Sequence, residues 1–369
     1  MVPRPAREGA PRTVGAAPRG LRQEPRRGRA LGARQRPAER RTDRVDGRPR
    51  RPGAEAAVSA PVLPTGRQYE ISAQTSFGHA VVTITEVAAS LRAFTVDGVD
   101  IVQRYPRDAP PSRGAGIIMS PWPNRVDGGR WVYEGEQHQL DITDTEFENA
   151  SHGLLKNTAY RMLDRSDSSI TLGATIFAHP GYPFVVDTTV TYALGDGGLE
   201  VSHTFTNTGG LRAPVAVGSH AYFKLGDVPV HSLVLSCAAE TVYENDARKL
   251  PVGTVPVSGA FDLRSGLPVG EVELDDCFTD LDRATPDGRW YATLTAPDAR
   301  SVSVWGDEAF GHIVICTTDV FLDENRELVD AIALEPQTAA VNALNTGIGL
   351  TWLQPGESWS ATWGVTASL

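Results

Sequence analysis

Residues 199–205, Leu-Glu-Val-Ser-His-Thr-Phe, decide the fold class of this chain. In an extended strand successive side chains point to opposite faces, so Leu199, Val201, His203 and Phe205 share one face. The same alternation recurs at 80–84 and 359–365, and turn sequences rich in glycine, aspartate and proline stand between such runs. No 12-residue window spaces its apolar residues by three and four, as an amphipathic helix does. We therefore predict an all-β fold, a large antiparallel sandwich in a single domain.

The composition is that of a protein with a sizeable core. A hydrophobic fraction of 41% with 22% charged residues in 369 excludes collagen, coiled coil and wholesale disorder. No stretch approaches the roughly 20 apolar residues that a membrane-spanning helix needs, so we expect no membrane partner. The cysteines Cys237, Cys277 and Cys316 are odd in number, widely spaced and in no CxxC pair, which argues against a disulfide framework and a thiolate zinc site. A reducing compartment follows, and we predict a cytoplasmic location.

The charge is divided unevenly along the chain. Residues 1–56 carry sixteen arginines and six acidic residues, a net charge of +10. Because the whole chain has a net charge of −10, the remaining residues carry −20. Residues 1–61 contain few large aliphatic side chains and cannot offset their ordering entropy by burial. We predict a disordered Arg/Pro-rich extension over 1–61 and a folded domain over 62–369. We expect this extension to be dispensable and expect no nucleic-acid partner. A nucleic-acid-binding arm is the alternative, because arginine clusters contact phosphates; a targeting peptide lacks the required apolar segment.

The common catalytic signatures are missing. The sequence has no GxGxxG motif opening a helix, no Walker loop, no HExxH and no GxSxG, so nucleotide-dependent chemistry, zinc proteolysis and α/β-hydrolase chemistry lose their usual support. The remaining candidates are histidines and carboxylates. His203 lies on the apolar face of its strand, and we predict a hydrogen-bonded structural role for it.

Three residues stand in contexts that suit a site. His152 in Ser-His-Gly and His220 in Gly-Ser-His are bordered by glycine, which lets backbone approach a ligand closely. Glu335 follows an apolar strand and precedes Pro336, which keeps it extended. Each of the three, taken alone, also fits a purely structural or solvated residue.

Taken together, the motifs resemble those of the aldose 1-epimerase (galactose mutarotase) family in order and spacing, over roughly residues 65–367. They are Pro-Trp-Pro-Asn-Arg at 121–125, Tyr-x-Gly at 133–135, Ser-His-Gly at 151–153, Gly-x-His-x-Tyr-Phe at 218–223, Asp-x-x-Phe at 275–278 and Leu-Glu-Pro-x-Thr at 334–338. The resemblance implies a β-supersandwich and cofactor-free interconversion of the α and β anomers of free aldoses.

The resemblance also implies a role for each residue. Mutarotation needs a base at the anomeric hydroxyl and an acid at the ring oxygen, and carboxylate and imidazole groups serve both purposes near neutral pH. By resemblance Glu335 is the base, His220 the acid and His152 a second donor. We expect Glu335 to favour the imidazolium form of His220. The predicted substrate-binding residues are Arg125, Asp275, Asn124, Tyr222 and Trp305, with Trp122 as another stacking face.

The substrate is expected to be a free aldohexose such as glucose or galactose, with no metal and no organic cofactor. A hexose 6-phosphate is the alternative substrate, for which Arg104, Arg107, Arg113 and Arg130 are candidate phosphate ligands, although the acidic folded part would repel it at long range. A non-catalytic sugar-binding module and a two-carboxylate glycosidase are further alternatives. The oligomeric state is left open.

Overall fold

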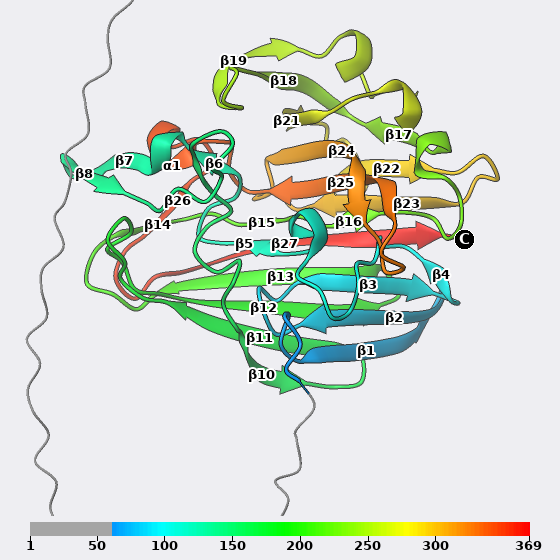
Figure 1. Cartoon of the computed structure of the whole chain (residues 1–369), viewed down its shortest axis with the longest axis horizontal. Helices are drawn as coiled ribbons and strands as arrows, with labels where there is room; N and C mark the ends of the chain where they lie inside the picture. Colours follow the sequence, from blue (N-terminus) through cyan, green and yellow to red (C-terminus); the bar gives the residue numbers. More distant parts are fainter. Residues whose placement is uncertain (1–60) are drawn as a thin grey trace, which may run out of the picture. The chain divides into compact units, whose positions relative to one another are not determined.

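A computed structural model gives the structure of this chain and describes residues 61–369 (Figure 1). The predicted disordered extension lies outside the described residues, save for Pro61 at its end. Strands make up most of the described part, and its only α-helix is α1 (Ala343–Thr346). All the paired strands in the sheets are antiparallel, which confirms the predicted all-β class. Among residues 61–369 no helix is long and apolar enough to cross a membrane.

The largest sheet has nine strands and contains the run from which the fold was predicted. Leu199, Val201, His203 and Phe205 are all buried in β13, and the neighbouring strand β27 buries Trp363 and Val365. In spatial order the strands are β10 (Arg161–Arg165), β11 (Ser169–Ile176), β12 (Val186–Gly195), β13 (Gly198–Asn207), β27 (Ser358–Ser368), β23 (Ser301–Gly306), β22 (Trp290–Thr295), β17 (Val234–Cys237) and β20 (Leu267–Pro268).

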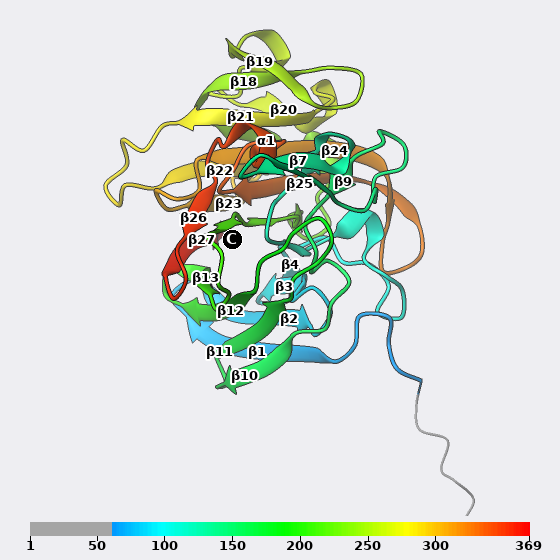
Figure 2. The same cartoon turned by 90° about the vertical axis from the view of Figure 1, so that its left-hand side faces the viewer.

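A second sheet of eight strands carries the candidate site. Its order is β19 (Pro251–Pro256), β18 (Ala239–Asn245), β21 (Asp275–Leu281), β24 (His312–Leu322), β25 (Leu328–Gln337), β15 (Gly218–Ser219) and β5 (Ile118–Met119), with β16 (Tyr222–Phe223) also paired to β25. Figure 2 shows β24 and β25 lying against β22 and β23 of the larger sheet.

A four-stranded sheet covers another part of the larger sheet, near β11 and β12 (Figures 1 and 2). It consists of β1 (Gln68–Thr75), β2 (Gly78–Thr85), β3 (Leu91–Val96) and β4 (Val99–Asp100). The two-stranded pairs are β6 (Arg125–Val126) with β9 (Ala150–Ser151), β7 (Arg130–Tyr133) with β8 (Glu136–Gln139), and β14 (Ala213–Val215) with β26 (Thr351–Leu353). Single 3-10 turns are η1 (Ser112–Gly114), η2 (Asp127–Gly129), η3 (Val230–Ser232), η4 (Gly259–Phe261) and η5 (Val269–Glu271).

The alternation of β25 separates the core from the site. Ile332 and Leu334 point into the main hydrophobic core between the sheets, whereas Ala331 and Ala333 belong to a separate cluster on the opposite face. Glu335 follows Ala333 at the same spacing of two, so it lies on that outer face. The strand therefore directs its apolar residues inward and its carboxyl group away from the core.

His203 has the structural role predicted for it. Its side chain is 1% exposed, and its Nε2 accepts a hydrogen bond of 3.1 Å from the indole N–H of Trp363 on β27. Burial lowers the pKa of His203 to about 3, so the imidazole is neutral and acts as an acceptor inside the core.

Candidate active site

The register of the eight-stranded sheet gathers residues that are far apart in sequence. Residues paired across neighbouring strands point to the same face. One row across the sheet therefore contains Asp275, Cys316, Ala333 and Tyr222, and the adjacent row contains Cys277, Val314 and Glu335. Glu335 thus lies in the middle of the sheet with neighbours on both sides, and its side chain is 2% exposed.

His220 meets Glu335 directly. Its Nε2 lies 3.4 Å from Oε1 of Glu335, and the whole residue is 8% exposed. The backbone N–H of His220 donates to the carbonyl of Ile117, and its carbonyl accepts from the N–H of Gly116. The imidazole stacks on Tyr222 with ring centroids 5.5 Å apart. Backbone pairing and stacking therefore fix the imidazole against the carboxyl group.

His152 completes a group of three. Its ring meets that of His220 edge to face with centroids 5.3 Å apart, and its backbone N–H donates to the carbonyl of Asn124. The chain turns sharply here, because both His152 and Gly153 have positive φ angles, +62° and +69°. A Cβ on Gly153 would lie 2.0 Å from the carbonyl oxygen of Ser120, so only glycine allows this approach. The structure brings together the three predicted acid/base residues.

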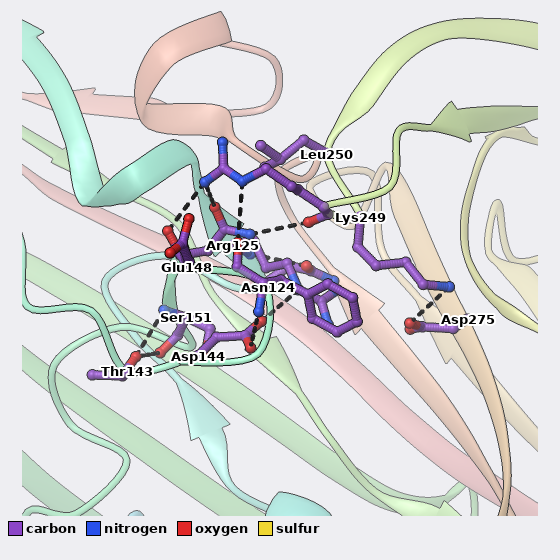
Figure 3. Close-up of polar contacts among 12 residues, drawn as sticks. Asn124, Arg125, Thr143, Asp144, Glu148, Ser151, Lys249, Leu250 and Asp275 are labelled. Carbon is purple, nitrogen blue, oxygen red and sulfur yellow. Dashed lines mark hydrogen bonds and ion pairs between the residues drawn. The ribbon is translucent and has the colours of Figure 1, made fainter. Parts of the chain in front are cut away.

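Arg125 is held beside this group by partners that the sequence did not indicate. It pairs with Ser151, the residue before His152, where β6 meets β9. Its Nε donates to Oδ2 of Asp144 at 2.8 Å (Figure 3). Its guanidinium carbon lies 5.0 Å from the ring centroid of Phe147. The side chain of Asn124 accepts a hydrogen bond from the backbone N–H of Arg125, which fixes the turn rather than leaving the amide oxygen free.

Asp275 lies at the start of β21 and forms an ion pair with Lys249. Oδ2 of Asp275 and Nζ of Lys249 are 3.2 Å apart, and both side chains are about one-third exposed (Figure 3). Asp275 is close enough to raise the pKa values of both His220 and Glu335. Sequence reasoning found Asp275 but not Lys249, because the hairpin that carries Lys249 has no motif of its own.

Burial dominates the electrostatics of the acid/base pair. It lowers the pKa of His220 to about 4, although Asp275 acts in the opposite direction. It raises the pKa of Glu335 well above the usual range, and Asp275 raises it further. The pKa of His152 is also well below its ordinary value, through burial and then through His220. The expectation of a standing imidazolium at His220 is therefore wrong: burial favours the neutral form of each group.

Gln337 is a functional candidate to which the sequence motifs assigned no role. Its Nε2 donates to Oε2 of Glu335 at 3.1 Å, and this hydrogen bond acts to lower the pKa of Glu335. The side chain is fully buried, and its Oε1 has no partner among the described residues. The spacing of two along β25 places both residues on one face, so the strand pattern could have indicated this contact.

Two predicted aromatic residues lie elsewhere in the packing. Trp305 is in β23 of the nine-stranded sheet, 2% exposed, with the guanidinium carbon of Arg289 3.5 Å from its ring centroid. Trp122 is also 2% exposed and packs against Tyr182. The structure does not bring Trp305 to the group around Glu335, whereas Tyr222 lies within that group through its stacking on His220.

The candidate phosphate ligands are dispersed. Arg104 forms ion pairs with Asp100 and Glu324, and Arg130 donates to the side chain of Gln139 in the β7–β8 hairpin. Arg113 differs, because it lies in η1 close enough to lower the pKa of His220.

The fold and the comparisons define the class of protein. The structure is a large antiparallel β-sandwich of the galactose mutarotase type, and similar solved structures share that fold. One is a GalM/aldose epimerase homologue from Caenorhabditis elegans, 19% identical, with a TM-score of 0.70 over 81% of this chain and 99% of that chain. Another is a galactose 1-epimerase from Lactobacillus acidophilus, 20% identical, with a TM-score of 0.65 over 82% and 99%.

The chain belongs to the aldose 1-epimerase family, whose sequence profile matches residues 71–366. The resemblance found in the motifs is thereby confirmed. Among curated proteins the chain is similar to the uncharacterized protein YihR of Escherichia coli K12, with 29% identity over 279 residues that cover 74% of this chain and 86% of YihR.

Proposed function

We propose that this protein is an aldose 1-epimerase that interconverts the α and β anomers of a free aldohexose such as glucose or galactose. The observation that carries the proposal is the 3.4 Å contact between His220 and Glu335, buried together on one face of the sheet beside His152. Membership of the family supports the same reaction. The sugar is the proposed partner, and the three free cysteines favour a reducing, cytoplasmic location.

The reaction requires one base and one acid at the same time, and the pair supplies both from a single shared proton. Two tautomers have the same proton count: neutral glutamic acid with neutral imidazole, or carboxylate with imidazolium. Burial favours the first, and hydrogen bonds from the sugar hydroxyls stabilise the second when substrate binds. The lowered pKa of His220 lies below the raised pKa of Glu335, so between the two values the pair holds one proton, which rests on the carboxyl group.

Ring opening then follows from the geometry. The carboxylate of Glu335 takes the proton from the anomeric hydroxyl while His220 donates its proton to the ring oxygen, which breaks the bond between that oxygen and C1. Rotation about C1–C2 presents the other face of the aldehyde. Glu335 returns its proton to the carbonyl oxygen as His220 removes one from the attacking hydroxyl, and the ring closes as the opposite anomer. His152 acts as a second donor to the ring oxygen, while Arg125 and Asp275 bind hydroxyl groups.

Anomer-exchange NMR tests the proposal. The protein should accelerate exchange of glucose or galactose above the uncatalysed rate, and Glu335→Gln should abolish that acceleration with little change in sugar affinity. Glu136→Gln, which changes an exposed glutamate of β8, is the matched control and should keep full activity. Undiminished exchange in Glu335→Gln would remove Glu335 from the mechanism.

A hexose 6-phosphate is the second candidate substrate, and the position of Arg113 favours it. This exposed guanidinium lies in η1, where Gly114 approaches His220. Acceleration with glucose 6-phosphate alone, lost in Arg113→Gln, would select the phosphate. Acceleration with free sugars in both proteins would select the aldohexose.

A further inference from the structure

Lysine is rare in this chain, and two of its three lysines border the candidate site. The sequence contains 35 basic residues, of which only Lys156, Lys224 and Lys249 are lysines. Nζ of Lys156 donates to the carbonyl of Ser151, next to His152, at 2.9 Å. Nζ of Lys249 lies 3.2 Å from Asp275. A chain that otherwise uses arginine thus places the flexible ammonium group beside its acid/base residues.

The β18–β19 hairpin holds Lys249 in place through its neighbour Arg248. The guanidinium of Arg248 donates to the carbonyls of Phe147 and Glu148, to Oδ1 of Asn149 and, at 2.6 Å, to Asp127. These contacts fix the hairpin against the loop that also carries Asp144. Arg248 is therefore a structural anchor, and the residue after it projects toward the sheet.

The backbone of Lys249 is in an uncommon conformation. Its φ angle is +59°, in the left-handed region that non-glycine residues rarely adopt. This turn directs the side chain to Asp275, as Figure 3 shows. This conformation suits the residue that closes a short hairpin turn, and the backbone N–H of Lys249 donates to the carbonyl of Asp246 across that turn.

The ion pair lies on the same sheet face as Glu335, and Asp275 is close enough to raise the pKa of Glu335. Asp275 is in β21, two strands away from β25, which corresponds to about 10 Å across the sheet. Both charged side chains are about one-third exposed, unlike the buried Glu335. A pyranose whose anomeric carbon meets Glu335 would therefore present its far hydroxyl groups to Asp275 and Lys249.

We propose that Lys249 is a substrate-binding residue that acts together with Asp275 on two adjacent hydroxyl groups of the sugar. Asp275 accepts a hydrogen bond from one hydroxyl, and the ammonium of Lys249 donates to its neighbour. Lysine suits this task better than arginine, because its three rotatable donors match hydroxyl oxygens, whereas the planar guanidinium matches carboxylates and phosphates. The inference rests on the proposed epimerase function and names the residues that select the sugar.

The test compares Lys249→Met and Lys249→Arg with wild type in the full chain, by anomer-exchange NMR and thermal melting. Arg264→Met is the matched control, because it removes the partly exposed ion pair with Asp262. We expect Lys249→Met to raise KM about tenfold or more, while kcat stays within about twofold of wild type. The melting temperature of Lys249→Met should be no lower than that of the control variant. Lys249→Arg should not restore KM.

Deoxy sugars identify the contact. In wild type, loss of the hydroxyl that Lys249 binds should raise KM, and in Lys249→Met the same loss should have no further effect. An unchanged KM in Lys249→Met, or a fall in kcat accompanied by a lower melting temperature, would overturn the inference while leaving the epimerase function intact. Absence of exchange activity in wild type with every sugar would instead overturn both.

Discussion

Replacement of Gln337 by methionine is expected to lower activity without lowering stability. The amide Nε2 donates to Oε2 of Glu335 at 3.1 Å, while Oε1 of the same amide is buried without a partner among the described residues. Methionine has a similar volume and no strongly polar atom, so the variant removes one useful donor and one costly acceptor together.

The two effects have opposite signs. A hydrogen bond to a charged group contributes about 1.5–3 kcal/mol, and this one has its full strength only when Glu335 is ionised as the base. Its loss should therefore lower kcat by about tenfold to a hundredfold. A buried polar atom without a partner costs about 1–3 kcal/mol, and the removal of Oε1 offsets the lost hydrogen bond. The free energy of unfolding should stay within about 1 kcal/mol of wild type or rise.

The pH profile distinguishes this role from simple packing. Gln337 acts to lower the pKa of Glu335, so that pKa should rise further in the variant. The pair loses its shared proton when Glu335 ionises beside neutral His220, and the limb where kcat/KM falls with rising pH should move upward. Anomer-exchange NMR across pH and urea unfolding measure both effects, with the exposed Gln354→Met as control. A kcat within about twofold of wild type and an unmoved limb would refute the reasoning.

Two other predictions follow from backbone geometry and from burial. Gly153→Ala should lower the free energy of unfolding by about 3 kcal/mol or more, because its Cβ would meet the carbonyl of Ser120. Gly135→Ala, where φ is +85° and the space around the Cβ is open, should lower it by only about 1 kcal/mol. Equal shifts in the melting temperatures of the two variants would contradict this prediction. Because burial raises the pKa of Glu335, the folded state loses stability as pH rises from the unfolded value near 4.5 toward the folded value. Glu335→Gln has no carboxyl group to ionise, so at neutral pH its unfolding midpoint should lie at a higher urea concentration than that of wild type. The difference between the two midpoints should shrink in acid, and a difference that does not depend on pH would contradict the prediction.

The fold was predictable because strand alternation reports burial directly. The run 199–205 predicted a half-buried strand, and β13 buries the expected residues. The same rule placed His203 in the core, where Trp363 donates a hydrogen bond to its Nε2. Alternation is a local property of the chain, so it can be recognised in the sequence of one strand without knowing which strands pair with it.

The neighbours of the candidate residues were not predictable in the same way. Lys249 is 26 positions from Asp275 in sequence, and Asp144 is 19 positions from Arg125. Both contacts arise where loops from different strands converge, and neither loop has a periodic pattern. The sequence also placed Glu335 at a strand end, whereas β25 continues to Gln337 and buries the carboxyl group.

The charge state of the site was mispredicted for a related reason. From the sequence, a glutamate near a histidine favours the charged imidazole through Coulomb attraction. The sign reverses when both groups are buried, since removal from water costs each charge more than the neighbour returns. How deeply a pair is buried depends on the register of several strands, here β25 with β24 and β16. Such depth cannot be read from any one of those strands.

The acid/base pair and the proposed binding pair of the site differ in how deeply they are buried. His220 and Glu335 are removed from water, where their pKa values shift in opposite directions until that of Glu335 lies above that of His220, and the pair retains one proton between the two values. Asp275 and Lys249 stay about one-third exposed, where charges remain hydrated and an ion pair is weak enough for hydroxyl groups to replace it. A deeply buried binding pair would resist that exchange, and an exposed acid/base pair would lose its proton balance. The opposite burial of the two pairs therefore lets one sheet face both bind a polyol and move its protons.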